Sequence, residues 1–465
     1  MSHLRLVPLA VLVLAACSPE AEQPSDPTVP KGYTHVRLSL ATAGMEATSR
    51  AWIDAAANDG EMMRKATVVV ADQAGTVQLI RRIMPESGES ERELIDLGTL
   101  PNGIYTFYNF GNLTDTYGES ETTASFNNFT YAVGQSVPDG ATDGTFTARF
   151  NRYNAARTGL PMTNIEQHTL DGGNATIALQ LYRQMAKMRL VVSNNTQGDV
   201  RISRVTVGNI TANDATLRFF PTKATTADGN EYAIIAWPDA TAPETANFDY
   251  YTAPSADAPF AVAQGIEATM PDAYLNESET DHITHQVPIA IEMQRLTDDG
   301  TWDAEVRHAL MNVSAMPRNA LIRVPVNLLD YMLELEAFFY PPIGGYPPFS
   351  MVKKNEEYYA TFHGSGDFQL IPHLYAWTDH DDPTKWFSLN DATVVVHTDG
   401  QQPSLTVRDP QGIFARAPYI DSVTGEILGT LSGNTGEATV SLTAYLRVNE
   451  LETYRYNRTI YFIAE

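Results

Sequence analysis

The sequence predicts an all-β protein built from several β-sandwich domains. Short segments that alternate apolar and polar residues recur along the chain, separated by turn residues, and no long segment has a helical period. Valine, threonine and tyrosine are plentiful, which favours strands, while 30 glycines and 27 prolines supply the turns. The chain has 465 residues, enough for two to four domains.

The first 16 residues read as a secretory signal. Arg5 precedes an apolar core at residues 6–14, which is too short to span a bilayer permanently. The Leu-Ala-Ala-Cys end at residues 14–17 resembles a bacterial lipobox, in which Cys17 is acylated after cleavage before it. The alternative is an ordinary signal peptide with a chance cysteine. Cys17 is the only cysteine, so no disulfide is expected.

A lone strand follows a polar, proline-rich tether at residues 18–27. Residues 35–40 alternate strictly, which places Val36, Leu38 and Leu40 on one buried face. No hairpin turn follows, so this strand is expected to pair with a segment distant in sequence and to be removable.

A cleavable junction is expected directly after that strand, between Arg50 and Ala51. Arg50 lies among small residues, as is typical of an exposed loop that a protease can cut. The alternative is an ordinary exposed arginine, and Arg64, Arg81 and Arg82 are competing candidates.

The first sandwich is predicted at residues 51–182, after a tether and removable strand at 17–50. Alternating segments and turns indicate four strands, and the Asn-, Thr-, Gly- and Asp-rich stretch 111–175 is expected to consist mainly of loops. The four predicted strands are residues 66–70, 77–80, 94–97 and 104–110.

A second sandwich is predicted at residues 183–340. Segments 187–192 and 200–207 flank a turn and repeat the plan of 65–80, which indicates either a duplicated sandwich or two similar hairpins. Residues 221–285 read as an acidic, aromatic insertion. Further strands are predicted at residues 287–294, 306–313, 321–326 and 332–339.

A smaller, immunoglobulin-like sandwich is predicted at residues 341–465, after a proline-rich segment that cannot pair in a sheet. The last strand is apolar on both faces, which favours a central strand of this domain over a strand donated to another subunit. The predicted strands are residues 358–362, 368–371, 392–396, 440–448 and 458–463.

No catalytic motif stands out, so no enzyme activity, cofactor or metal is expected. The cluster at residues 378–382 lacks the glycine and distal glutamate of a calcium loop, and a solvated turn is favoured. Tyr375, Trp377 and Trp386 form either a sugar-stacking platform or part of a core. The formal charge of −25 argues against binding nucleic acid or an anionic membrane surface.

Several segments together resemble the fimbrillin family, lipoprotein subunits of type V pili. They are the lipobox, the detached strand, the Ser-Arg-Ala junction, and three runs: Leu-Pro-Asn-Gly-Ile-Tyr-Thr-Phe-Tyr-Asn-Phe-Gly-Asn (100–112), Lys-Met-Arg-Leu-Val-Val-Ser-Asn-Asn (187–195), and Arg318-Asn319 through Val324-Pro325-Val326 to Asp330-Tyr331. The resemblance covers roughly residues 1–340.

The resemblance implies two transthyretin-like, Greek-key sandwiches and assembly by strand exchange. The chain would reach the outer membrane through lipid on Cys17, and an arginine-specific protease would cut after Arg50. A strand from another fimbrial subunit would then fill the emptied groove at the cell surface. The extra third domain favours a tip or accessory subunit over a stalk subunit, with a host or bacterial surface ligand as a further partner.

Two other functions remain as alternatives. One is a surface-anchored glycan-binding lipoprotein whose third domain is the lectin. The other is a hydrolase on a β-sandwich, for which no pair of acidic residues is singled out by the sequence.

Overall fold

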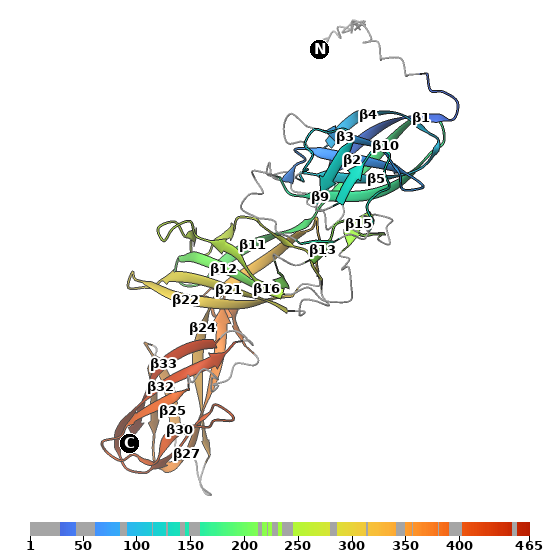
Figure 1. Ribbon diagram of the computed structural model, residues 1–465. Coiled ribbons are helices and arrows are strands. Elements are labelled where there is room, and N and C mark those ends of the chain that lie inside the picture. Colours follow the sequence, from blue (N-terminus) through green and yellow to red (C-terminus); the bar gives the residue numbers. More distant parts are fainter. Residues whose placement is uncertain are drawn as a thin grey trace, which may run out of the picture.

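The computed structural model is all-β, as predicted, and its strands form three units in a row (Figure 1). We number the units from the N-terminal end. The structure describes residues 28–42, 61–83, 91–113, 115–126, 129–139, 145–147, 159–212, 216–220, 222–225, 231–234, 245–279, 286–312, 315–340, 349–355, 357–379, 381–389, 402–448 and 453–465.

The first unit is a sheet that folds over itself. Its order is β3-β2-β5-β9-β10-β1-β4, and only the last two residues of β10 pair with β9, so the chain turns a corner there. The strands are β1 (Tyr33–Thr42), β2 (Ala66–Asp72), β3 (Val77–Ile83), β4 (Glu91–Pro101), β5 (Gly103–Gly111), β9 (Met162–Leu170) and β10 (Gly173–Arg183).

Two apolar clusters stabilise this unit, one on each face of β2 and β5. Val68 and Phe107 face the cluster that also holds the apolar side chains of β1 and β10. Val69 and Phe110 lie on the opposite face and belong to the second cluster. The hairpin of β6 (Thr123–Phe126) and β7 (Phe129–Ala132) and the side chain of Phe219 cover that cluster. Two short ladders lie beyond these clusters, β8 (Thr145–Thr147) with β13 (Thr216–Arg218) and β14 (Thr222–Thr225) with β15 (Glu231–Ile234).

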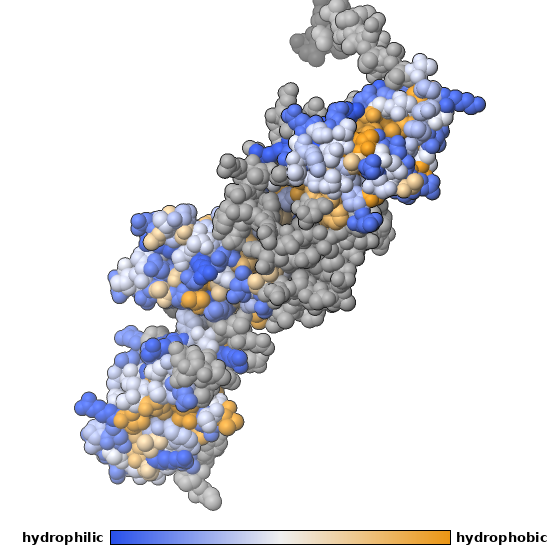
Figure 2. Space-filling model, viewed as in Figure 1, coloured by the Kyte–Doolittle hydropathy of each residue, from blue (hydrophilic) through white to orange (hydrophobic). Residues whose placement is uncertain are grey.

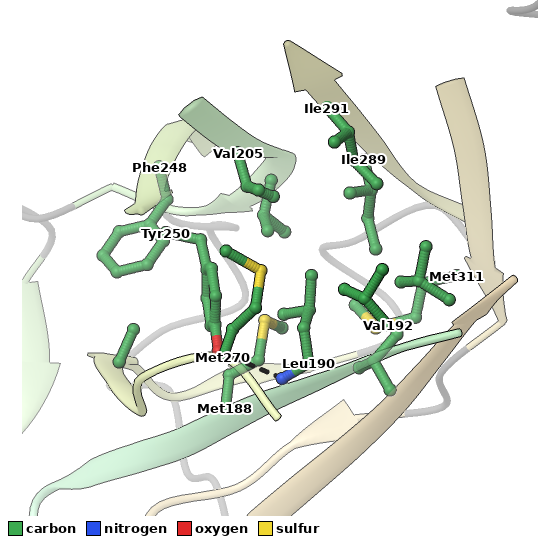
Figure 3. Packing of buried hydrophobic residues seen from close by; sticks show 14 of the residues in the cluster. Met188, Leu190, Val192, Val205, Phe248, Tyr250, Met270, Ile289, Ile291 and Met311 are labelled. Atoms are coloured by element: carbon green, nitrogen blue, oxygen red, sulfur yellow. Dashed lines mark hydrogen bonds between the residues drawn. The ribbon is translucent and has the colours of Figure 1, made fainter. Parts of the chain in front are cut away.

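The second unit packs two sheets around one apolar core. Figure 3 shows side chains of β11 in this core, where the Leu190 N–H donates to the Tyr250 hydroxyl at 3.0 Å. One sheet holds β18, β19, β11 and β24, and the other holds β16, β17, β12, β21 and β22. The strands are β11 (Met185–Asn195), β12 (Val200–Thr211), β16 (Thr245–Thr252), β17 (Phe260–Val262), β18 (Glu267–Thr269), β19 (Ala273–Asn276), β20 (Ser278–Glu279), β21 (Gln286–Leu296), β22 (Trp302–Asn312), β23 (Ala315–Met316) and β24 (Leu321–Tyr340).

Strand β24 replaces the two strands predicted at 321–326 and 332–339. It is continuous over 20 residues. Its first half pairs with β11 and its second half pairs with β27 (Ser365–Trp377), so it runs from the second unit into the third. The side chains of Leu333 and Leu335 belong to the third core, although the proline-rich segment at 341 was the predicted domain boundary.

The third unit also packs two sheets together. One contains the second half of β24 with β27, β28, β31 and β30, and the other has the order β25-β26-β33-β32-β29. The strands are β25 (Phe349–Lys354), β26 (Glu357–Phe362), β27 (Ser365–Trp377), β28 (Trp386–Ser388), β29 (Ser404–Arg408), β30 (Phe414–Ile420), β31 (Ile427–Ser432), β32 (Gly436–Arg447) and β33 (Thr453–Ala464). The strand predicted at 392–396 lies outside the described residues.

Each of the first two units is closed by a parallel pair between its first and last strands. These pairs are β1 with β10 and β11 with β24. In the third unit β26 and the last strand, β33, are likewise parallel. A parallel pair needs a long crossover connection, and here the crossover is most of the unit.

Two further sequence-based expectations were wrong. Strand β9 and the first three residues of β10 lie within residues 111–175, where mainly loops were expected. The strand β9 was not recognised because polar residues interrupt its apolar pattern. The interpretation of 187–207 as a hairpin fails because β11 and β12 lie in different sheets. The transthyretin-like and immunoglobulin-like assignments stay predictions.

Candidate functional site: the first strand and its slot

Strand β1 lies between two neighbours and is paired along both edges. It runs parallel to β10, from Thr34 opposite Gly173 to Thr42 opposite Leu181. On its other edge it runs antiparallel to β4, with two irregularities in the register. The expectation that this strand pairs with distant segments is therefore confirmed.

The inward face of β1 fills a slot in the first core. The side chains of Val36, Leu38 and Leu40 are each 0 % exposed and lie in one cluster with the inward residues of β10, β2 and β5. Burying an aliphatic side chain of this size contributes about 1.5–3 kcal/mol. Without these three side chains the slot would be an apolar cavity open between β4 and β10.

The beginning of β1 is held by two turns of the first unit. The Thr34 hydroxyl donates to Asn102 Oδ1 at 2.9 Å and accepts from the Gly172 N–H at 2.8 Å. The Asn102 N–H also donates to the Gly32 carbonyl at 2.9 Å. Asn102 joins β4 to β5 and Gly172 joins β9 to β10, so these bonds fix the register of β1 against both neighbours.

The chain downstream of the predicted cut is held by contacts of its own. The Arg183 guanidinium donates to the Glu61 carbonyl at 3.0 Å. The Asn112 amide donates to the Met62 carbonyl at 2.8 Å, and its Oδ1 accepts from the Arg64 N–H at 2.8 Å. None of these bonds involves β1, so the anchoring of residues 61–64 does not depend on that strand.

A buried charge cluster joins this anchor to the second unit. Lys187 Nζ lies 2.8 Å from Glu61 Oε1 and 3.0 Å from Asp272 Oδ2, and the Lys187 and Glu61 side chains are 1 % and 0 % exposed. The Tyr274 hydroxyl donates to Glu61 Oε1 at 2.5 Å. Burial alone would raise the pKa of Asp272, but hydrogen bonds from Arg189 and Lys187 lower it below its usual value.

A second buried ion pair lies nearby. The Arg318 guanidinium donates through Nε to Glu277 Oε2 at 2.6 Å and through Nη2 to Oε1, with both side chains at most 1 % exposed. Arg318 Nη1 also donates to the carbonyl of Phe219, which packs on the first unit. The Arg183 Nη1 donates to Asn319 Oδ1 at 2.9 Å, so these polar groups link the two units.

Sequence reasoning missed this junction. Lys187, Arg318 and Asn319 were noted only as parts of motifs that carry a resemblance. The available signal was Lys187, which lies between apolar residues in a predicted strand, because a buried cation requires a buried partner. The partners Glu61, Asp272 and Glu277 lie 41 to 126 positions away, and periodicity does not identify them.

The aromatic cluster of the third unit is only partly open to solvent. Trp377 of β27 is 5 % exposed and stands opposite Trp386 of β28, with ring centroids 6.0 Å apart. Trp386 and Tyr375 are half-buried. A sugar platform here would use these two rings rather than Trp377, and it stays a prediction.

The acidic cluster at residues 378–382 forms a turn where the structure describes it. Asp382 Oδ1 accepts from the Thr384 N–H at 3.0 Å and from its hydroxyl at 2.6 Å, which lowers the pKa of Asp382. Among the described residues no group of three His, Cys, Asp or Glu side chains could hold a metal ion.

Cys17, Arg50 and Ala51 lie outside the described residues, so lipidation and cleavage stay predictions. No helix in the described part of the chain is long and apolar enough to cross a membrane.

The last strand of the chain is central in its sheet, as the sequence favoured. β33 pairs in parallel with β26 and antiparallel with β32. Ile460 and Phe462 are buried in the third core, at 0 % and 1 % exposure. Removing β33 would therefore divide this sheet and empty the core.

Comparison with known proteins finds similarity only among solved structures, since no family model and no curated protein matches. A fimbrilin from Porphyromonas gingivalis W83 is 13% identical, with 65% of this chain and 89% of that chain covered and a TM-score of 0.35. The tip fimbrial protein Mfa3 from Porphyromonas gingivalis, with a C-terminal truncation, is 11% identical, with 67% and 96% covered and a TM-score of 0.34. A fimbrial assembly protein from Parabacteroides distasonis is 11% identical, with 76% and 98% covered and a TM-score of 0.33.

Proposed function

We propose that this chain is a structural subunit of a cell-surface fimbria that supports adhesion and accepts a donor strand in place of β1. The observation that carries the proposal is the position of β1, which is paired on both edges and fills an apolar slot with Val36, Leu38 and Leu40. The role is structural, with no catalysis.

Removal of β1 would create a strong template for another strand. It would expose the pairing edges of β10 and β4 together with three aliphatic slots. Exposed sheet edges recruit strands through main-chain hydrogen bonds, and alternate side-chain pockets add specificity. The contact is head-to-tail, so it extends a filament and does not close a ring.

Processing precedes assembly in this proposal. Lipid on Cys17 anchors the chain to the outer membrane, and an arginine-specific protease cuts at Arg50. The alternative arginines are less suited to cutting. Arg81 and Arg82 lie within β3, where Arg82 is paired with Asp115, and the Arg64 N–H is bonded to Asn112. A protease needs an extended, accessible chain, which paired strands do not provide.

We infer a tip or accessory position from β33. A stalk subunit must both accept a strand and donate one. Here the C-terminal strand is committed to the centre of the third unit, between β26 and β32. The chain therefore accepts a strand without donating its own last strand, which suits the end of a filament.

Two variants in the cells that produce the protein test this route. Arg50→Ala is expected to leave the chain uncut and absent from sheared fimbriae, and Cys17→Ala is expected to abolish labelling by palmitate. Arg64→Ala is the matched control and is expected to be processed and incorporated normally. Normal incorporation of uncut Arg50→Ala protein would refute assembly by removal of β1.

A further inference from the structure

A row of four side chains crosses the outer face of one sheet in the third unit. By register, Arg408 of β29 stands beside Thr439 of β32, Thr439 beside Tyr461 of β33, and Tyr461 beside Tyr359 of β26. Their neighbours Val440, Ile460 and Ala360 point into the core, so alternation along each strand places the row outside.

The two tyrosines form a fixed stack. Their rings are parallel to within 10° with centroids 4.8 Å apart. Glu357 accepts hydrogen bonds from both hydroxyls, at 3.1 Å from Tyr359 and 3.0 Å from Tyr461, and this bond raises the pKa of Tyr461. Lys354 Nζ lies 5.6 Å from the Tyr359 ring centroid. One face of the Tyr461 ring packs on Tyr359. The other face points toward Thr439 and is not covered by this stack.

That open face borders a hollow of about 300 Å³. Thr439 lies between Tyr461 on one side and Arg408 on the other. Glu437, Gln411, Pro410 and Ile463 also contribute to the lining. The Gln411 Oε1 accepts from the Glu437 N–H, which holds this side chain over the end of β32. Arg408 and Glu437 are exposed, and neither forms an ion pair with another residue that the structure describes.

The width of the hollow matches one six-membered sugar ring. Tyr461 and Arg408 stand two strands apart, which is about 9.5 Å at the usual strand spacing. Apolar contacts are best at about 3.5–4.0 Å, so one ring fits between them with contacts on both faces. Thr439 is small enough to leave this space, whereas a large side chain there would fill it.

The chemistry of the lining selects a sugar over an apolar ring. The Tyr461 ring offers a face for the C–H groups of a pyranose, while the Arg408 guanidinium and the Glu437 carboxylate can bond pairs of hydroxyl groups. Pockets of this kind combine apolar contact with a few placed polar groups. The next row along the sheet carries only hydroxyls, from Thr406, Ser441 and Thr459, and would accommodate further sugar units.

We propose that this hollow binds a pyranose unit of a glycan, stacked on Tyr461 between that ring and Arg408. The site lies in the third unit, away from β1 in the first, and is independent of the proposed strand exchange (Figure 1). Figure 2 shows hydrophobic and hydrophilic surface side by side on the third unit; the four residues of the row are hydrophilic on that scale, so its hydrophobic patches do not mark the proposed site. The proposed site also differs from the cluster of Tyr375, Trp377 and Trp386.

Saturation-transfer NMR on the full chain tests the proposal, in a detergent without a sugar headgroup. The probes are the methyl glycosides of glucose, galactose, mannose, fucose and N-acetylglucosamine. We expect transfer to at least one of them. Thr439→Phe, which fills the hollow and keeps a good strand former, should weaken binding at least about tenfold, as should Tyr461→Ala.

Tyr445→Ala is the matched control, since Tyr445 lies on the same face of β32 but outside the hollow. It should bind as the unchanged chain does. No transfer to any of the five glycosides, or transfer that survives both Thr439→Phe and Tyr461→Ala, would overturn the proposal. Thr439→Phe removes no side-chain contact that holds the sheet together. A loss of binding in this variant therefore indicates a blocked site and not a misfolded domain.

Discussion

Leu38→Asp is expected to unfold the first unit while the third unit stays folded. Leu38 is 0 % exposed at the centre of β1 and belongs to the buried hydrophobic cluster of the first unit. The change removes about 1.5–3 kcal/mol of apolar burial. It also places an unpaired carboxylate in that cluster, which costs several kcal/mol more. The total approaches the whole stability of a typical domain, about 5–15 kcal/mol.

Hydrogen exchange followed by mass spectrometry resolves this effect unit by unit, which a single melting curve of a multi-domain chain does not. Peptides from β2 and β5 should lose protection, and peptides from β31 and β32 should keep it. Ser39→Asp is the control, because the half-buried Ser39 lies on the opposite face of β1. Equal protection in the two variants would mean that β1 does not stabilise the first core.

Arg318→Met is expected to destabilise the junction between the first two units by about 3–5 kcal/mol, because it leaves the Glu277 carboxylate buried without its partner. The double variant Arg318→Met with Glu277→Leu removes both charges and should recover most of this loss. Exchange rates of peptides from β19 and β11 measure the change.

An exposed ion pair of the second unit provides the matched control. Arg204 and Asp249 lie 2.6 Å apart, but their side chains are 44% and 42% exposed. Arg204→Met should therefore leave the same exchange rates unchanged. If the double Arg318 and Glu277 variant were as unstable as Arg318→Met alone, the unpaired carboxylate would not be the cause.

The sequence identified β1 because the alternation of apolar and polar residues at 35–40 is strict. It also indicated that the strand has no hairpin partner, since no turn follows. The partners themselves, β4 and β10, are set by tertiary pairing at separations of at least 50 residues for β4 and 139 residues for β10. The sequence also did not reveal that β9 is a strand or that β24 is continuous, because both features depend on pairing with strands distant in sequence.

The residues of the candidate sites also differ in whether the sequence could predict them. Val36, Leu38 and Leu40 were predictable because they share one face of one strand. The row at Tyr461 was not, because its four members lie between positions 359 and 461 and come together only through the register of four strands. The buried pair of Arg318 and Glu277 also depends on folding to bring the charges together.

The most direct test of the account is a strand-replacement measurement on the full chain. An arginine-specific protease is applied, the new N-terminus is sequenced, and a labelled peptide of residues 33–42 is added. The account predicts one product that begins at Ala51, remains folded and takes up the peptide, whereas the uncut chain and a Leu38→Asp peptide show no uptake. Resistance at Arg50, or a cut product that takes up no peptide, would contradict it.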